Sequence, residues 1–162
     1  KSCCRLVYIN KEMIKNKIRI DYDSNLSCHK KMINEINDFF THKSNKNLEI
    51  SKYYTDDFIF YSFPAGNKKG IKTCKSDYLN KFILLKEKDR SLKIVHSIYL
   101  PGIDKDSYEL NGSVRVYYGA IISEGSNNVE FSGYQTIDFI DGKISAIWEW
   151  ADYGGINNLL TV

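Results

Sequence analysis

Residues 129–153, with the sequence VEFSGYQTIDFIDGKISAIWEWADY, decide the fold. Two runs rich in aromatic and β-branched residues flank Asp141-Gly142, a dipeptide that readily adopts the positive φ angles of a two-residue hairpin turn. The stretch therefore predicts two antiparallel strands, over about 129–140 and 143–153.

A two-residue loop also determines which side chains of this hairpin share a face. Counting outward from the turn pairs Gln135 with Trp148 and Tyr134 with Glu149. Because side chains alternate along a strand, Glu149 and Asp152 are expected on opposite faces, so only one of them can face an interior cavity. Burial raises the pKa of a carboxyl group, which makes both residues candidates for a general acid or base. Asp152 has a second interpretation, as the cap of the turn that follows it.

The N-terminal part of the chain is predicted to form a helix after an extension. Apolar residues recur at three- and four-residue spacing over about 27–43, which is typical of an amphipathic helix, and serines near its start can cap it. His29 falls on the apolar side of this helix and is interpreted as a packed or exposed residue rather than a catalytic one. Residues 1–25 show no clean period and are interpreted as an extension, which leaves residues 26–162 as a single domain.

Between this helix and the final hairpin, the pattern predicts a strand, a second helix and two more strands. The aromatic run 58–63 is typical of a strand, and apolar residues at helical spacing follow from Gly70-Ile71 onward. The period then becomes two, which predicts strands over about 92–100 and 107–122, with a break at Pro101-Gly102. Helices that precede a run of hairpins indicate an α+β fold, with a curved antiparallel sheet wrapped around the N-terminal helices.

The composition argues against several classes of protein. The chain has 162 residues, 43% of them hydrophobic, and a formal net charge of +3, which is typical of one globular domain. No apolar run approaches the roughly 18 to 20 residues that a membrane-spanning helix needs, so no transmembrane segment is expected. The basic residues are nearly all lysines spread over predicted helices, which is typical of solvated faces, so no nucleic-acid partner is expected.

The cysteines indicate no metal site. Cys3, Cys4, Cys28 and Cys74 show neither a CxxC pair nor another regular ligand spacing, and the chain has no phosphate-binding loop or dinucleotide fingerprint. We therefore expect neither a metal nor a cofactor. The localisation stays open between the cytoplasm and export, because Cys3 also suits the lipidated cysteine of an exported lipoprotein.

Four short motifs follow one another along the chain in a characteristic order. They are Tyr53-Tyr54-Thr55-Asp56-Asp57-Phe58 at the first strand, Gly70-Ile71, Asp141-Gly142-Lys143-Ile144 and Trp148-Glu149-Trp150-Ala151-Asp152. Over about residues 27–160 their order and spacing resemble the SnoaL-like polyketide cyclases of the nuclear transport factor two superfamily. The resemblance implies a cystatin-like, cone-shaped α+β barrel that binds a small apolar, carbonyl-bearing or cyclic molecule. It also implies cofactor-free acid/base chemistry of the cyclase, isomerase or hydrolase type.

The resemblance implies a role for Glu149 in particular. In the SnoaL-like cyclases a carboxylate on the last strand is the general acid/base, and the match places Glu149 at that position. It further implies that Tyr134 and Thr136 share the pocket face with Glu149, while the two tryptophans face outward and become buried in a homodimer. Gln135 and Phe60 stand near positions where the family has a histidine and an asparagine, so ligand binding is implied and the reaction stays open.

Two alternatives remain. On apolar content alone, the face that carries both tryptophans would be the inner one, which would bring Asp152 to the pocket. A non-catalytic module that dimerises or docks a partner through the tryptophan face is the alternative function, so the sequence leaves open whether the chain is an enzyme.

The candidate catalytic residues are Glu149 and Asp152, and the candidate ligand-binding residues are Gln135 and Tyr134 as orienting donors, Phe60 and Ser62 as wall residues, Thr136 and Trp150.

Overall fold

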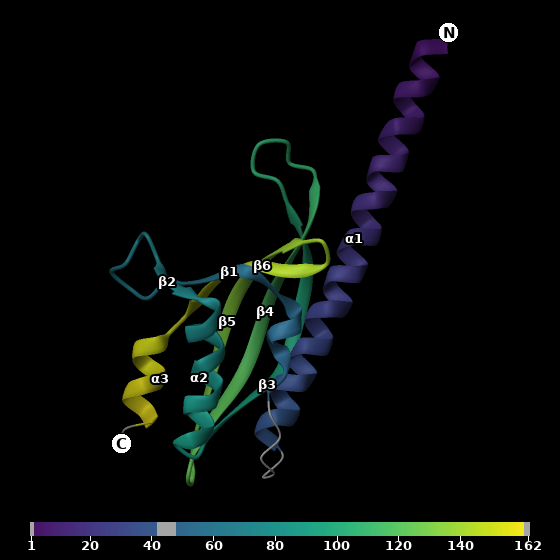
Figure 1. Ribbon diagram of the computed structural model, residues 1–162. Coiled ribbons are helices and arrows are strands. Elements are labelled where there is room, and N and C mark those ends of the chain that lie inside the picture. Colours follow the sequence, from purple (N-terminus) through teal and green to yellow (C-terminus); the bar gives the residue numbers. More distant parts are fainter. Residues whose placement is uncertain (1, 42–47, 161–162) are drawn as a thin grey trace.

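The structure is a computed structural model that describes residues 2–41 and 48–160, with side chains from residue 21 onward. A six-stranded sheet curves beside the helices (Figure 1). The helices are α1 (Ser2–Thr41), the short 3-10 helix η1 (Ile50–Tyr53), α2 (Lys75–Glu87) and α3 (Tyr153–Leu160). The strands are β1 (Tyr54–Ser62), β2 (Ile71–Cys74), β3 (Arg90–Ile103), β4 (Leu110–Glu124), β5 (Asn127–Ile140) and β6 (Lys143–Ala151).

The strands lie in the order β2-β1-β6-β5-β4-β3. Neighbours are antiparallel except β1 and β6, which run parallel and are separated in the chain by α2 and four strands. α1 packs against β3 and β4, and α2 packs against β1 and β3, so both helices cover one face of the sheet (Figure 1). Met32 of α1, Phe82 of α2 and Val116 of β4 share the buried core between them. The predicted α+β class is confirmed.

α1 is longer than predicted, because it begins at Ser2 rather than near residue 27. No glycine or proline interrupts residues 2–41, and the polar residues of the cluster 21–25 each cost at most about 0.7 kcal/mol in a helix. Asn25 donates a hydrogen bond of 3.0 Å to the carbonyl oxygen of Gly112, which ties α1 to β4. The division expected after residue 25 falls inside this helix, whose N-terminal half extends away from the sheet (Figure 1).

Two of the four cysteine side chains lie within the described residues. Cys28 and Cys74 are free thiols. The side chain of Cys3 lies outside the described residues, so its lipidation stays a prediction. None of the described helices combines the length and the apolar character that crossing a membrane requires. Within the same residues, no three His, Cys, Asp or Glu side chains are grouped as a metal site would need.

The second helix begins later than predicted. Ile71–Cys74 forms the edge strand β2, which pairs with the end of β1, and α2 starts only at Lys75. The β-branched Ile71 and Thr73 favour an extended backbone, and Ile71 is 47% exposed instead of belonging to a helical apolar face. The predicted start of the second helix at Gly70-Ile71 is therefore wrong, and Gly70, with φ +73°, belongs to the loop before β2.

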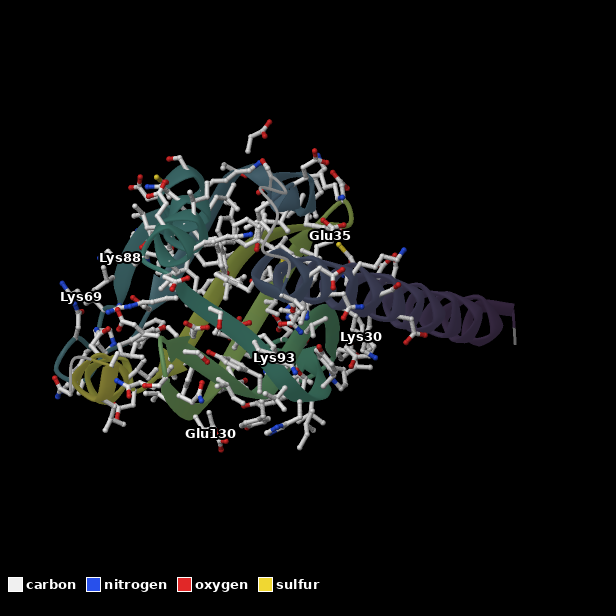
Figure 2. The ribbon with its side chains drawn as sticks, turned by 90° about the horizontal axis from the view of Figure 1, so that it is seen from below. Lys30, Glu35, Lys69, Lys88, Lys93 and Glu130 are labelled. Atoms are coloured by element: carbon white, nitrogen blue, oxygen red, sulfur yellow. The ribbon has the colours of Figure 1, made fainter. Side chains whose placement is uncertain are left out.

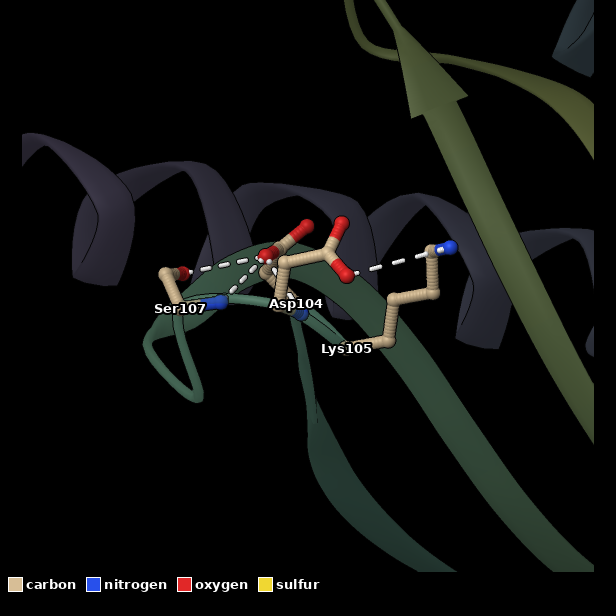
Figure 3. A network of polar contacts seen from close by, with 4 residues as sticks. Asp104, Lys105 and Ser107 are labelled. Carbon is tan, nitrogen blue, oxygen red and sulfur yellow. Dashed lines mark hydrogen bonds and ion pairs between the residues drawn. The ribbon is translucent and has the colours of Figure 1, made fainter.

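The break between β3 and β4 also lies further along the chain than predicted. Pro101-Gly102 lies within β3, where a proline is tolerated because β3 is an edge strand with an irregular register at this point. The turn is built by Asp104, whose carboxylate accepts hydrogen bonds from the backbone N–H groups of Ser107 (2.8 Å) and Asp106 (3.0 Å) and from the Ser107 hydroxyl (Figure 3). These hydrogen bonds, the backbone ones first, lower the pKa of the Asp104 carboxyl group.

A β-bulge shifts the register of the final hairpin by one residue. Phe139 pairs with Ile144 as predicted, but the next pair is Asp138 with Ala146, so Ser145 is an extra residue in β6. A one-residue shift turns every later side chain to the other face. The corrected pairs are Gln135 with Glu149, Thr136 with Trp148 and Tyr134 with Trp150. The predicted pairing of Gln135 with Trp148 and of Tyr134 with Glu149 is therefore wrong.

Candidate functional site

A cavity of about 410 Å³ lies between the helices and the inner face of the sheet. Small-molecule sites typically have volumes of about 300 to 1,000 Å³, so the cavity suits a small organic ligand. Exposed residues of two helices, Lys81 and Leu84 of α2 and Asn157 of α3, border the cavity and place its opening between these helices. The apolar part of the wall includes Met32, Ile36, Phe60, Phe82, Val116 and Phe131.

Glu149 lines this cavity and accepts hydrogen bonds from three side chains. The hydroxyl of Tyr118, on β4, donates to its Oε2 at 2.9 Å, and the Nε2 of Gln135, on β5, donates to the same oxygen. The hydroxyl of Tyr153, the first residue of α3, donates to Oε1 at 2.5 Å. Both carboxylate oxygens thus accept hydrogen bonds, and hydrogen bonds of this kind are strongest when the acceptor is ionised. All four side chains belong to the cavity wall.

The two tyrosines that contact Glu149 hold their protons firmly. Burial, followed by the charge of Glu149 and the hydrogen bond to it, raises the pKa of Tyr118 and of Tyr153 well above the usual value for tyrosine. Burial and then the charge of Glu149 raise the pKa of Tyr78, another wall residue, in the same way. Near neutral pH the tyrosine hydroxyls around Glu149 are therefore neutral hydrogen-bond donors.

Asp152 has a different role from Glu149 in the structure. Its side chain is exposed, and its Oδ1 accepts a hydrogen bond of 2.9 Å from the backbone N–H of Gly155. Its carbonyl oxygen accepts another, of 3.0 Å, from the N–H of Ile156. These are the contacts of a residue that caps the start of α3, so the geometry matches the interpretation of Asp152 as a cap.

The other predicted site residues are divided between the two faces of the sheet. Phe60 and Gln135 line the cavity, and Ser62 pairs with Glu149 at the end of β1 but does not line it. Tyr134, Thr136 and Trp150 lie on the outer face, away from the cavity, because the extra residue in β6 makes Glu149 share the inner face with Gln135 instead of with Tyr134 and Thr136. There the hydroxyl of Thr136 donates to that of Tyr134 at 3.2 Å, and the Tyr134 ring lies 5.7 Å from the ring of Trp150.

Several wall residues were not among the predicted site residues, and they include Tyr118, Tyr153 and His29. Tyr153 belongs to α3, a helix that the sequence pattern did not predict, so nothing linked it to Glu149. His29 is 1% exposed, lines the cavity, and packs edge-on against Tyr99 with ring centroids 5.8 Å apart. Neither of its ring nitrogens has a hydrogen-bond partner among the described residues. Burial lowers the pKa of His29 to about 4, so its imidazole is neutral near pH 7.

Comparisons with known proteins identify the fold. No protein-family model and no curated protein matches the sequence. A phenazine biosynthesis-related protein from Pseudomonas aeruginosa has a TM-score of 0.62 with 11% identity, covering 91% of each chain. A Xanthomonas campestris pv. campestris protein provisionally described as a polyketide cyclase has a TM-score of 0.62 with 7% identity, covering 86% of this chain and 98% of its own. An NTF2-like protein from Anabaena variabilis has a TM-score of 0.55 with 16% identity, covering 80% and 90%.

Proposed function

This chain has the NTF2-like fold, which the SnoaL-like resemblance implied, and we propose that it binds a small apolar molecule in its cavity and moves a proton on it through Glu149. The observation that carries the proposal is the position of Glu149 at the wall of an apolar cavity, with three side-chain donors. Support also comes from the resemblance, which implies a general acid/base at the same residue. One structural neighbour is provisionally described as a polyketide cyclase and another, from Bacillus subtilis, as an isomerase.

A proton on the carbon next to a carbonyl group is the simplest one for this site to move. Glu149 accepts the proton, the electron pair of the C–H bond shifts toward the carbonyl group, and the resulting enolate oxygen carries the negative charge. Once protonated, Glu149 is a weaker acceptor, so the hydroxyls of Tyr118 and Tyr153 donate to the enolate instead. Return of the proton to another carbon completes an isomerisation, for which neither a metal nor a cofactor is invoked.

The substitution Glu149→Gln tests this role. We expect the variant to fold and to bind ligand, because the amide nearly keeps the shape of the carboxylate, and to lose roughly a hundredfold or more in rate, the usual contribution of a general base. The rate is that of deuterium uptake from heavy water by 2-tetralone, an apolar cyclic ketone, followed by proton NMR against the rate without protein. Equal rates for the variant and the wild type would exclude Glu149 from the mechanism.

Asp152→Ala is the matched control, because it removes a carboxylate close to the site but outside the cavity. We expect the loss of the cap of α3 to lower the free energy of unfolding by about 0.5–2 kcal/mol. The rate of deuterium uptake should stay within a fewfold of the wild-type rate. A loss of rate as large as that of Glu149→Gln would show that any nearby carboxylate matters, and would contradict a specific role for Glu149.

The outer face of the sheet supports a second candidate function, a dimerisation or interaction module. Trp150 is 43% exposed and stacks on Phe63 with ring centroids 4.5 Å apart, and Tyr117 of β4 and Ile98 of β3 are more than half exposed. Exposed apolar clusters of this kind mark interaction surfaces. We propose that two copies of the chain associate through this outer face, and this association is compatible with the ligand site on the other side of the sheet.

A further inference from the structure

Three positively charged side chains border the cavity. Lys81 and Lys88 are seven residues apart, about two turns of helix, so they lie on the same side of α2 and its C-terminus. Arg90 follows as the first residue of β3 and also lines the cavity. Figure 2 shows Lys88 near the end of α2 and, on β3, Lys93, a lysine that does not line the cavity.

Arg90 is held in place by an ion pair. Its Nη2 lies 2.9 Å from Oε2 of Glu124, on β4, and its side chain is only 19% exposed. Its Nε is buried and has no hydrogen-bond partner among the described residues. Because Glu124 does not line the cavity, the ion pair fixes the guanidinium group from outside and leaves part of its donor capacity toward the cavity wall.

Apart from Glu124, which pairs with Arg90 from outside the cavity, little negative charge faces these cations. Among the described residues that line the cavity, Glu149 is the sole acid, and it already accepts three hydrogen bonds. Asp89 lies between Lys88 and Arg90 in the sequence but does not line the cavity, and α3, with the sequence YGGINNLL, carries no charged residue. Lys81 lies within 3.4 Å of the Thr73 hydroxyl, whereas Lys88 has no ion-pair partner within the described part of the chain.

We infer that the ligand of this cavity carries a carboxylate on an apolar body, and that Arg90 and Lys88 bind this carboxylate at the rim. The inference rests on the proposed function, since it names the class of molecule that the same cavity takes. A planar guanidinium group and a flexible ammonium group that line the same cavity suit a carboxylate, because charge-assisted hydrogen bonds are stronger than neutral ones. The apolar body of the ligand then extends along the wall toward Glu149.

A matched pair of probes tests the inference on the full chain. 2-Naphthoate and 2-naphthamide share an apolar body and differ in charge, and isothermal titration calorimetry gives the dissociation constant of each. We expect wild-type protein to bind the naphthoate at least roughly tenfold more tightly at low salt, and this ratio to fall as salt is raised. Lys88→Gln and Arg90→Gln should each bring the ratio toward one by weakening the binding of the naphthoate, whereas Lys93→Gln should leave the ratio as it is.

The outcomes separate this inference from the proposed function. Equal affinities of the wild type for the two probes would overturn the carboxylate inference and leave ligand binding in the cavity intact. An equal loss of the ratio in Lys93→Gln would also overturn it, because the preference would then reflect surface charge in general. Binding of neither probe would contradict both the proposed ligand site and this inference. Thermal unfolding of each variant checks that Arg90→Gln, which breaks an ion pair, still folds.

Discussion

His29 combines complete burial with a titratable ring at the wall of the cavity. An unbonded polar group in such a place costs on the order of 1–3 kcal/mol, and a charged one costs more. The folded protein therefore keeps this imidazole neutral, whereas the unfolded chain leaves it free to take up a proton. This difference links the stability of the whole fold to the protonation of one side chain.

The expected result is a loss of stability in mild acid. The unfolded chain binds a proton at His29 as the pH falls through about 6.5, while the folded chain does not do so until about 4. Between these values the free energy of unfolding should fall, by about 3 kcal/mol in total for this residue. Urea unfolding of wild type and His29→Leu across pH 7 to 4 measures the difference, because the carboxylates that also titrate are common to both.

His96→Gln is the control for this comparison, since His96 is exposed on the outer face of β3. Its pH profile should follow that of the wild type. If His29→Leu lost stability toward acid as steeply as the wild type does, His29 would not be the group responsible.

At the level of elements, the pairing of β4 with β5 positions one donor to Glu149. Gly133 lies opposite Tyr118, and a Cβ atom at this glycine would lie 2.4 Å from the Cζ and hydroxyl oxygen of Tyr118. The absence of a side chain at Gly133 thus lets the tyrosine ring lie flat across β5 with its hydroxyl on Glu149.

Gly133→Ala should displace the Tyr118 ring and weaken its hydrogen bond to Glu149. We expect the free energy of unfolding to fall by roughly 1–3 kcal/mol, as in other overpacked sites, together with slower deuterium uptake by 2-tetralone. Chemical denaturation and the exchange assay measure the two effects. Gly119→Ala is the matched control on β4, where the atoms nearest to the new Cβ belong to the exposed ring of His96, which can turn into solvent. A rate unchanged in Gly133→Ala would mean that Tyr118 is dispensable.

The same strand pairs show how far the sequence could predict the site. Asp141-Gly142 correctly predicted the hairpin, and the order of helices and strands predicted the class of fold. The register depended on the bulge at Ser145, which little in the sequence indicates. Ile144 and Ile147 are both fully buried although they are three residues apart, a spacing that would put them on opposite faces of a regular strand. A strand pattern alone therefore could not bring Gln135 beside Glu149.

Other parts of the site depend on contacts between elements that are distant in the sequence. Tyr153 reaches Glu149 only because α3 begins directly after β6, and a short helix with two glycines gives little helical signal. Among the described residues neither ring nitrogen of His29 has a hydrogen-bond partner, and this likewise follows from packing and not from any local pattern.

For the whole molecule, the two faces of the sheet predict its assembly. We expect the wild type to sediment as a dimer in analytical ultracentrifugation, because association would bury the exposed rings around Trp150. Trp150→Lys should shift the protein to a monomer, since a charge at the centre of an apolar interface is left without a partner. Ile83→Lys changes a residue of α2 that is equally exposed, at 44%, and should leave the dimer intact. A monomeric wild type at micromolar concentration would contradict the proposed association.

The alternation along β6 has a consequence for how such a protein can diversify. Beyond the bulge at Ser145, Glu149 and Ala151 face the cavity, whereas Trp148 and Trp150 face away from it, so a single strand contributes to two surfaces. Substitutions at Trp148 and Trp150 would change the proposed association while the chemistry of the cavity is kept, and substitutions at Glu149 and Ala151 would do the reverse. Ligand preference and quaternary structure can therefore evolve, or be engineered in separate libraries, without each constraining the other.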